Sequence, residues 1–144
     1  MRLFTIGFVK KSAKEFFETL KNNEVSRVID IRLNNKSQLA GFSKKEDLQY
    51  FLKEICNIDY VHLVRFAPTK ELLNSYKKKN INWEQYEKDY TAILDQRNVL
   101  ENIDYSIFEN ACLLCSEPSA QQCHRRLLAE YLTKNNNKII IKHL

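Results

Sequence analysis

Short apolar runs typical of β-strands alternate with helix-like segments along most of this chain. The strand-like runs cover residues 3–6, 27–31, 59–63, 111–115 and 138–142. Helical patterns cover 12–20, 43–55, 70–78, a segment from 82 onward, and 120–133, with Ser12, Ser43 and Ser119 as expected N-caps. Strands separated by helices pair in parallel through right-handed crossovers. We therefore expect a single α/β domain over residues 1–144, a mostly parallel sheet of about five strands with helices on both faces.

Length and composition narrow the class of protein further. The chain has 144 residues, of which 44% are hydrophobic, enough for one substantial core. Its first residues form too short an apolar run for a signal peptide, and no segment approaches the ~20 apolar residues that span a bilayer. Its four cysteines are unevenly spaced, unlike a secreted disulfide framework. We expect a soluble, cytoplasmic protein with reduced thiols and no membrane partner.

The net charge of the chain indicates what kind of partner it binds. The net charge of +5 favours an anionic partner such as nucleic acid or a nucleotide. A lysine-rich surface can also serve solubility alone, so charge leaves both interpretations open.

Polar residues follow the expected strands at the points where those strands end. In a parallel sheet these carboxyl ends share one edge, and ligands of open α/β sheets bind there. The residues predicted at this edge are Gly7, Asp30, Arg32, His62, Cys115 and Glu117.

The segment from Cys115 to Arg125 gathers reactive side chains between an apolar strand and an amphipathic helix. It holds two thiols, a carboxylate, an imidazole and a guanidinium within one corner. Helix N-termini attract anions and stabilise thiolates. Successive helical residues point about 100° apart, so only one of Arg125 and Arg126 can face the sheet edge. We expect Arg125 to contact an anion there, with His124 beside it.

The same residues resemble a known family. Thr5-Ile-Gly7, Asp30-Ile-Arg32, Tyr60-Val-His-Leu63 and Cys115-x-Glu117-x5-Cys123-His124-Arg125 resemble, in this order, the bacterial and archaeal domain of unknown function 488 family. The resemblance covers nearly the whole chain. Phe8 and Val9 stand where that family usually has His and Ser. The resemblance implies the extent of the domain and the location of the site, and it implies no reaction.

Several candidate residues have a structural interpretation as well as a functional one. Asp30 and Arg32 lie on the same side of their strand and can pair with each other as readily as act on a substrate. His62 is more often structural than functional in such a position. Cys115 is either reactive or simply packed. Cys112 and Cys115 point to opposite faces of their strand and cannot form a metal or redox pair, so we expect Cys112, like Cys56, to be a small buried hydrophobic residue.

A zinc site is the remaining cofactor possibility. Cys115, Cys123, His124 and His62 offer suitable ligand atoms. If Cys123 and His124 belong to one helix, they diverge by about 100° and cannot easily share a metal. We expect no metal and no other cofactor.

Two classes of function follow from these residues. The first is an enzyme acting on an anionic, phosphate-bearing substrate, with Cys115, Glu117 and His124 catalytic and Arg32, Arg125, Asp30, His62 and Gly7 binding substrate. In it, Glu117 or Asp30 would orient His124. The second is a nucleic-acid or nucleotide binding protein without catalysis. A rhodanese-like sulfur transferase using Cys115 is a more distant alternative, because such enzymes share an Asp-x-Arg strand end and a strand-end cysteine. The combination of thiol, imidazole and carboxylate favours the enzyme.

Overall fold

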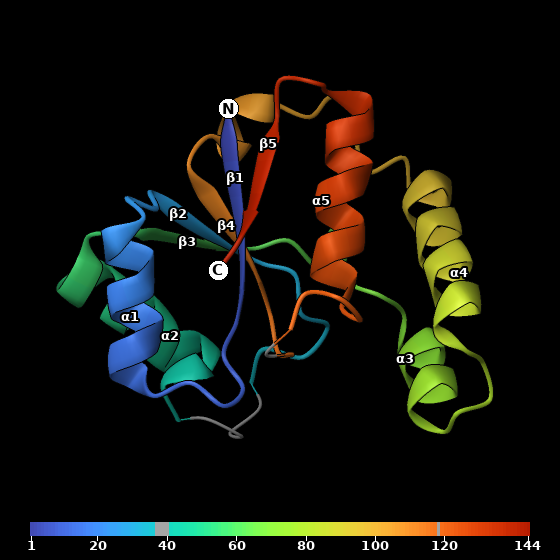
Figure 1. Ribbon diagram of the computed structural model, residues 1–144, viewed down its shortest axis with the longest axis horizontal. Helices are drawn as coiled ribbons and strands as arrows, with labels where there is room; N and C mark the ends of the chain where they lie inside the picture. The colour runs from blue at the N-terminus through green and yellow to red at the C-terminus, as the bar shows by residue number, and fades with distance from the viewer. Residues whose placement is uncertain (37–40, 118) are drawn as a thin grey trace.

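Five parallel strands form one sheet at the centre of the molecule (Figure 1). The computed structural model describes residues 1–36, 41–117 and 119–144. The strands are β1 (Arg2–Gly7), β2 (Arg27–Asp30), β3 (Asp59–His62), β4 (Ala111–Cys115) and β5 (Ile140–His143). Their order across the sheet is β3-β2-β4-β1-β5. The predicted α/β class and parallel sheet are confirmed.

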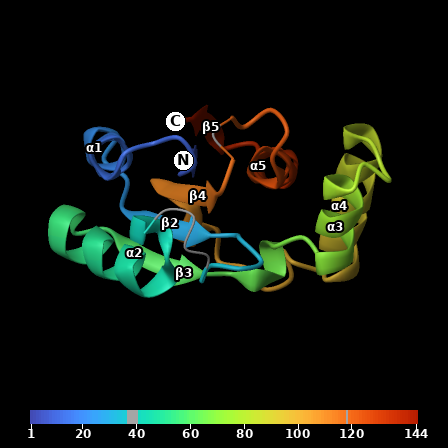
Figure 2. The same ribbon diagram turned by 90° about the horizontal axis from the view of Figure 1, so that it is seen from below.

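Helices cover both faces of this sheet, as expected. The α-helices are α1 (Ala13–Asn22), α2 (Lys45–Phe51), α3 (Lys70–Lys77), α4 (Trp83–Gln96) and α5 (His124–Asn135). Short 3-10 turns occupy Gly41–Ser43, Val64–Phe66 and Tyr105–Phe108, and a π-helical segment, Leu52–Cys56, extends α2. Figure 2 shows α1 and α2 on one face of the sheet, and α5 with the α3–α4 pair beyond it on the other. No helix in the described ranges is both long and apolar enough to cross a membrane.

Alternating strand residues divide the core into two halves. Phe4 and Cys112 pack with the side chains of α1 and α2, whereas Leu3 and Leu113 pack with those of α4 and α5. Cys115 therefore faces the α5 side, opposite to Cys112, because side chains alternate along a strand. The expected burial holds for Cys112 but not fully for Cys56, which is half-buried at the end of the π-helical segment.

Two of the three expected serine caps differ from the prediction. Ser12 caps α1 by accepting a hydrogen bond of 3.1 Å from the Glu15 amide, as expected. Ser43 instead belongs to a 3-10 turn, so α2 begins after an extended Lys44.

The last helix starts four residues later than predicted. The Ser119 hydroxyl accepts a hydrogen bond of 3.3 Å from the Gln121 amide, and the chain stays in turns until Cys123. Cys123 is the N-cap of α5, with φ −140° and ψ 141°. Such local side-chain bonds offer the backbone an alternative to helix. Cys123 is therefore extended rather than helical, which changes its relation to His124.

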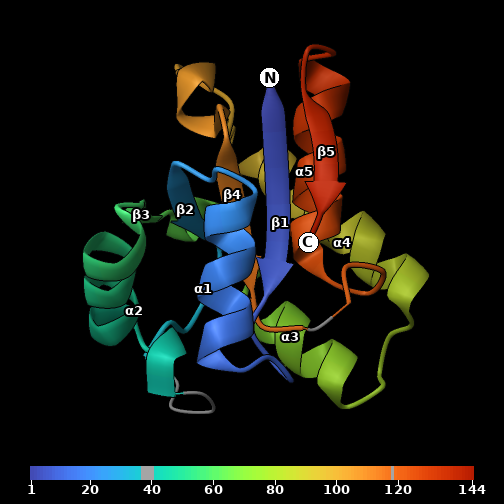
Figure 3. The same cartoon turned by 60° about the vertical axis from the view of Figure 1, so that its left-hand side comes forward.

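The parallel strands end at one edge of the sheet, which Figure 3 shows at the lower end of the strands. The strand pairing aligns Gly7 of β1 with Cys115 of β4, and Asp30 of β2 with His62 of β3. This alignment places the predicted site residues of four strands on neighbouring positions.

Candidate functional site

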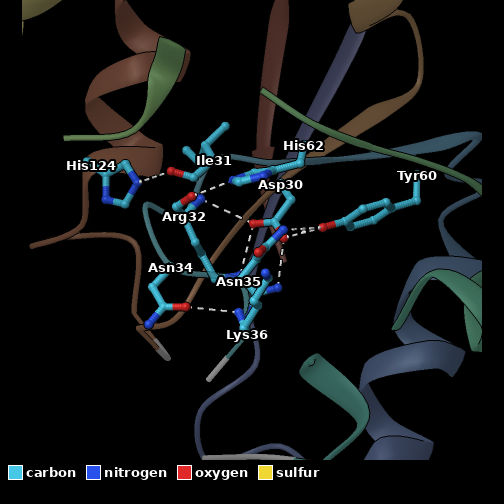
Figure 4. A network of polar contacts seen from close by, with 9 residues as sticks. All are labelled: Asp30, Ile31, Arg32, Asn34, Asn35, Lys36, Tyr60, His62 and His124. Carbon is cyan, nitrogen blue, oxygen red and sulfur yellow. Dashed lines mark hydrogen bonds and ion pairs between the residues drawn. The ribbon is translucent and has the colours of Figure 1, made fainter. Parts of the chain in front are cut away.

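A buried ion pair occupies the end of β2. Arg32 donates to both carboxylate oxygens of Asp30, from Nε at 2.9 Å to Oδ1 and from Nη2 at 2.7 Å to Oδ2 (Figure 4). Both side chains are buried. The Tyr60 hydroxyl donates to Asp30 Oδ2 at 2.6 Å, and burial followed by the nearby carboxylate raises the pKa of that hydroxyl. In this structure Asp30 and Arg32 pair with each other, which is the structural one of the two interpretations.

Two further side chains complete this network. Asn35 donates from Nδ2 to the Tyr60 hydroxyl at 3.1 Å. His62 lies 2.7 Å, through Nε2, from the backbone carbonyl of Arg32. Because a carbonyl only accepts, His62 Nε2 carries a proton and holds the loop after β2. His62 thus contacts backbone, in agreement with its structural interpretation.

One donor of Arg32 points away from these partners. Its Nη1 is buried and has no hydrogen-bond partner among the described residues. The guanidinium also lies over the Phe8 ring, 5.2 Å from the ring centre. A buried guanidinium donor without a partner is costly, so this atom is suited to donate a hydrogen bond to a ligand oxygen.

Cys115, at the end of β4, lies between a second thiol and an imidazole. Its Sγ is 2.7 Å from Cys123 Sγ and 3.5 Å from His124 Nδ1. All three residues are buried, with exposed fractions of 4% for Cys115, 3% for Cys123 and 7% for His124. Strand β4 positions the first sulfur, and the extended N-cap and first residue of α5 position the other two groups. We call these three residues the thiol cluster.

A backbone carbonyl fixes the tautomer of the neutral His124 side chain. Its Nε2 lies 2.9 Å from the Ile31 carbonyl oxygen, which only accepts, so Nε2 must donate (Figure 4). In the neutral imidazole Nδ1 is then the free base, and it faces Cys115. The sequence predicted that Glu117 or Asp30 would orient this histidine. That prediction is wrong, because the orienting group is the Ile31 carbonyl.

The two thiols of the cluster have pKa values that shift in opposite directions. Burial acts to raise the pKa of Cys115, but the hydrogen bond from Cys123 and the charge of Arg125 oppose it. Backbone hydrogen bonds at Glu117 and Ser116 also favour the thiolate, and the net pKa is lowered. Burial, followed by the adjacent Cys115, raises the pKa of Cys123 well above the usual value. Of the two sulfurs, Cys115 is therefore the one more readily ionised, and Cys123 donates a hydrogen bond to it.

Arg125 is an internal brace of the β4–α5 corner. It is the largest fully buried side chain, with an exposed fraction of 0%, and its Nη1 donates to the Glu117 carbonyl. The Glu117 side chain is exposed, and it is the backbone carbonyl of this residue that accepts the hydrogen bond from Arg125. Gly7 leaves room for both groups: a Cβ at Gly7 would lie 1.6 Å from the Glu117 oxygen and 2.7 Å from Arg125 Nη1. The sequence predicted Arg125 and Gly7 as substrate contacts, but both lie within the scaffold.

Comparison with known proteins supports the family resemblance stated in the sequence analysis. The family model "Domain of unknown function DUF488" matches residues 12–132, most of the chain. The protein belongs to the DUF488 family. Neither a curated protein nor a solved structure shows a significant match. Every residue of the thiol cluster in this DUF488 protein falls inside the matched segment.

The thiol cluster also corrects the geometric argument about metals. Its three ligand atoms lie within 4.8 Å of one another, although adjacent helical residues were expected to diverge. The argument fails because Cys123 is extended and precedes the helix. His62, the fourth ligand considered, bonds the Arg32 carbonyl instead. Two thiolates on one tetrahedral zinc lie about 3.8 Å apart, further than the 2.7 Å between these sulfurs.

We therefore expect this DUF488 protein, purified without chelators, to contain no stoichiometric zinc. Three ligands at this sulfur separation do not match a closed tetrahedral site. Elemental analysis of the purified protein, beside its Cys115→Ser variant, checks this. One zinc per chain that the variant loses would contradict it.

Sequence reasoning missed two residues of the site. It treated Tyr60 only as part of a motif, although Tyr60 lies two positions before His62 and so on the same face of β3. It placed Cys123 inside a helix, which hid its proximity to Cys115. The spacing of the strand residues contained the first signal, whereas nothing local marked the second.

Proposed function

We propose that this DUF488 protein is an enzyme that acts on an anionic, phosphate-bearing substrate, a nucleotide or nucleic acid, with Cys115 as its nucleophile. The observation that carries this proposal is the Cys115–His124 pair, 3.5 Å apart, with the imidazole oriented by the Ile31 carbonyl. A nucleophile, a base within reach and a third group that orients the base are the elements of nucleophilic catalysis. The buried Cys112 thiol, with its pKa raised by burial, has no such surroundings.

The chemistry assigned to each group follows from its protonation. His124 Nδ1 takes the proton of the Cys115 thiol, which leaves a thiolate beside an imidazolium. The thiolate forms a covalent bond to the electrophilic atom of the substrate, and the imidazolium returns its proton to the leaving group. Water then loses a proton to His124 and displaces the Cys115 sulfur, which restores the free enzyme. The amides at Ser116 and Glu117 stabilise the sulfur anion at the start and end of this cycle.

The anionic character of the substrate rests on charge. The chain carries a net charge of +5, and Arg32 Nη1 has an unsatisfied donor near the same sheet edge. Arg125 supports the site from inside and is not assigned to the substrate. Four unevenly spaced cysteines are typical of a protein whose thiols stay reduced, and we place the protein in the cytoplasm.

Alkylation by iodoacetamide tests the nucleophile. Because the thiolate is the reactive form, modification accelerates as pH rises through the thiol pKa. The lowered pKa of Cys115 puts this rise at lower pH than for Cys56, whose pKa burial raises. At neutral pH we expect Cys115 to react about tenfold faster than the more exposed Cys56, as measured by mass spectrometry.

A panel of nucleotides, short DNA and RNA, and p-nitrophenyl phosphate tests the substrate. We expect at least one member to slow the alkylation of Cys115 and to be turned over, with turnover lost in Cys115→Ser. Binding that weakens with salt but is never followed by turnover would instead support the nucleic-acid or nucleotide binding function. If Cys115 reacts no faster than Cys56, the assignment of the nucleophile is wrong.

A further inference from the structure

The proposed hydrolytic cycle uses only one of the two sulfurs in the thiol cluster. Cys123 Sγ lies 2.7 Å from Cys115 Sγ, nearer than His124 is. If Cys123 only filled space, a side chain without a thiol could serve equally well at that position. Cys123 therefore has a position that the hydrolytic cycle does not explain.

We infer that Cys115 and Cys123 are a redox pair that a hydroperoxide converts to an intramolecular disulfide, with Cys115 attacking first and Cys123 resolving. This activity goes beyond the proposed function and shares with it the Cys115 thiolate and His124. The ligand class is a small hydroperoxide, hydrogen peroxide being the simplest member.

The reaction consists of two balanced steps. In the first, the Cys115 thiolate attacks the terminal oxygen of the hydroperoxide, the O–O bond breaks, and the departing alkoxide or hydroxide takes a proton from His124. Cys115 becomes a sulfenic acid and the peroxide is reduced to an alcohol or water. In the second, the Cys123 sulfur attacks the Cys115 sulfur, an S–S bond forms, and hydroxide leaves with the Cys123 proton as water. A dithiol reductant such as dithiothreitol returns both thiols.

The surroundings of the two sulfurs assign these separate roles. Cys115 receives the hydrogen bond of Cys123 and backbone hydrogen bonds at Ser116 and Glu117, all of which stabilise a thiolate. His124 favours the Cys123 thiolate, but burial and the adjacent Cys115 outweigh it, and the pKa of Cys123 is raised. The first attack needs a thiolate, whereas the second needs only proximity and a route for one proton. The order Cys115 then Cys123 follows.

The local backbone permits the second step. A disulfide bond is about 2.05 Å long, so the two sulfurs need to approach by about 0.7 Å. Cys123 precedes the first turn of α5, and its side chain makes no capping hydrogen bond. Its sulfur can therefore move without the loss of a helical hydrogen bond. Cys115 has an exposed fraction of 4%, and it lies directly before Ser116, which is half-buried, and Glu117, which is exposed.

The test is oxidation with a small excess of hydrogen peroxide, followed by blocking of free thiols in denaturant and tryptic mass spectrometry. Trypsin leaves Cys112, Cys115 and Cys123 in the one peptide 98–125, so fragmentation between Leu113 and Leu114 is needed to separate Cys112. We expect this peptide to lose two hydrogens, with both lost from the part that holds Cys115 and Cys123. Cys112 and Cys56 should remain free, and dithiothreitol should restore the mass.

Two variants separate the roles of the sulfurs, with Cys56→Ser as the control for a half-buried thiol outside the cluster. Cys123→Ser should accumulate a Cys115 sulfenic acid that dimedone traps, about tenfold above wild type. Cys115→Ser should leave Cys123 reduced at the same peroxide dose. Cys56→Ser should form the disulfide at the wild-type rate. Circular dichroism establishes that each variant is folded, and alkylation in denaturant counts its thiols.

Three outcomes would overturn the inference. Equal dimedone labelling of wild type and Cys123→Ser means that Cys123 does not resolve, while the proposed nucleophile stands if iodoacetamide still selects Cys115. A disulfide that joins two chains, or one that includes Cys112, assigns the wrong pair. Failure of Cys115 to react with either peroxide or iodoacetamide would remove both this inference and the proposed function.

Discussion

Replacing Gly7 by alanine is expected to destabilise the fold by about 3 kcal/mol or more. The added Cβ would lie 1.6 Å from the Glu117 carbonyl oxygen, which belongs to the backbone and cannot rotate away. The corner between β4 and α5 must shift to admit it. Because the Glu117 and Ser116 backbone stabilises the Cys115 thiolate, the variant should also alkylate more slowly at neutral pH.

Gly41→Ala is the matched control for this change. A Cβ at Gly41 meets no atom within 4 Å among the described residues, so the control should stay within about 0.5 kcal/mol of wild type. Urea unfolding of both variants measures the difference. Equal stabilities would show that the β4–α5 corner yields easily, and the role assigned to Gly7 would be wrong.

Arg125→Ala is expected to cost about 3 kcal/mol of folding stability, and Arg126→Ala about 1 kcal/mol or less. Arg125 is fully buried and bonds the Glu117 carbonyl, so its loss removes a charged hydrogen bond and leaves a cavity. Arg126 pairs with Glu87 at 2.7 Å and Glu130 at 2.9 Å, but its side chain is 24% exposed and both carboxylates are more so. Exposed ion pairs contribute little.

Arg125→Ala is also expected to change the reactivity of Cys115. The charge of Arg125 lowers the pKa of Cys115, so its removal raises that pKa. The rise in alkylation rate with pH should therefore move to higher pH in Arg125→Ala and stay in place in Arg126→Ala. Thermal unfolding with and without phosphate, sulfate or a nucleotide separates the two interpretations of Arg125. If Arg125→Ala has wild-type stability without the anion and is only less stabilised by the anion, Arg125 binds ligand, and its assignment as an internal brace is wrong.

The fold was largely predictable because its signals are local. Each strand is a short apolar run and each crossover a helical pattern, and these periodicities are set by neighbouring residues. A parallel sheet was then the expected arrangement, since alternating strands and helices are typical of α/β domains with parallel sheets. The start of α5 was not predictable in this way. The Ser119 hydroxyl bonds an amide two residues on, and the segment before Cys123 stays in turns.

The candidate site divides along the same line. The sequence by itself determined that Asp30, His62 and Cys115 lie along one sheet edge, because parallel strands end together and each strand end was readable. Only the tertiary structure decided what these groups contact. In the folded protein Arg32 forms an ion pair with Asp30, Arg125 is fully buried, and Cys123 Sγ contacts Cys115 Sγ. Those contacts depend on where α5 begins and how it packs on β4, and no local pattern in the sequence determines a distance between two separate elements.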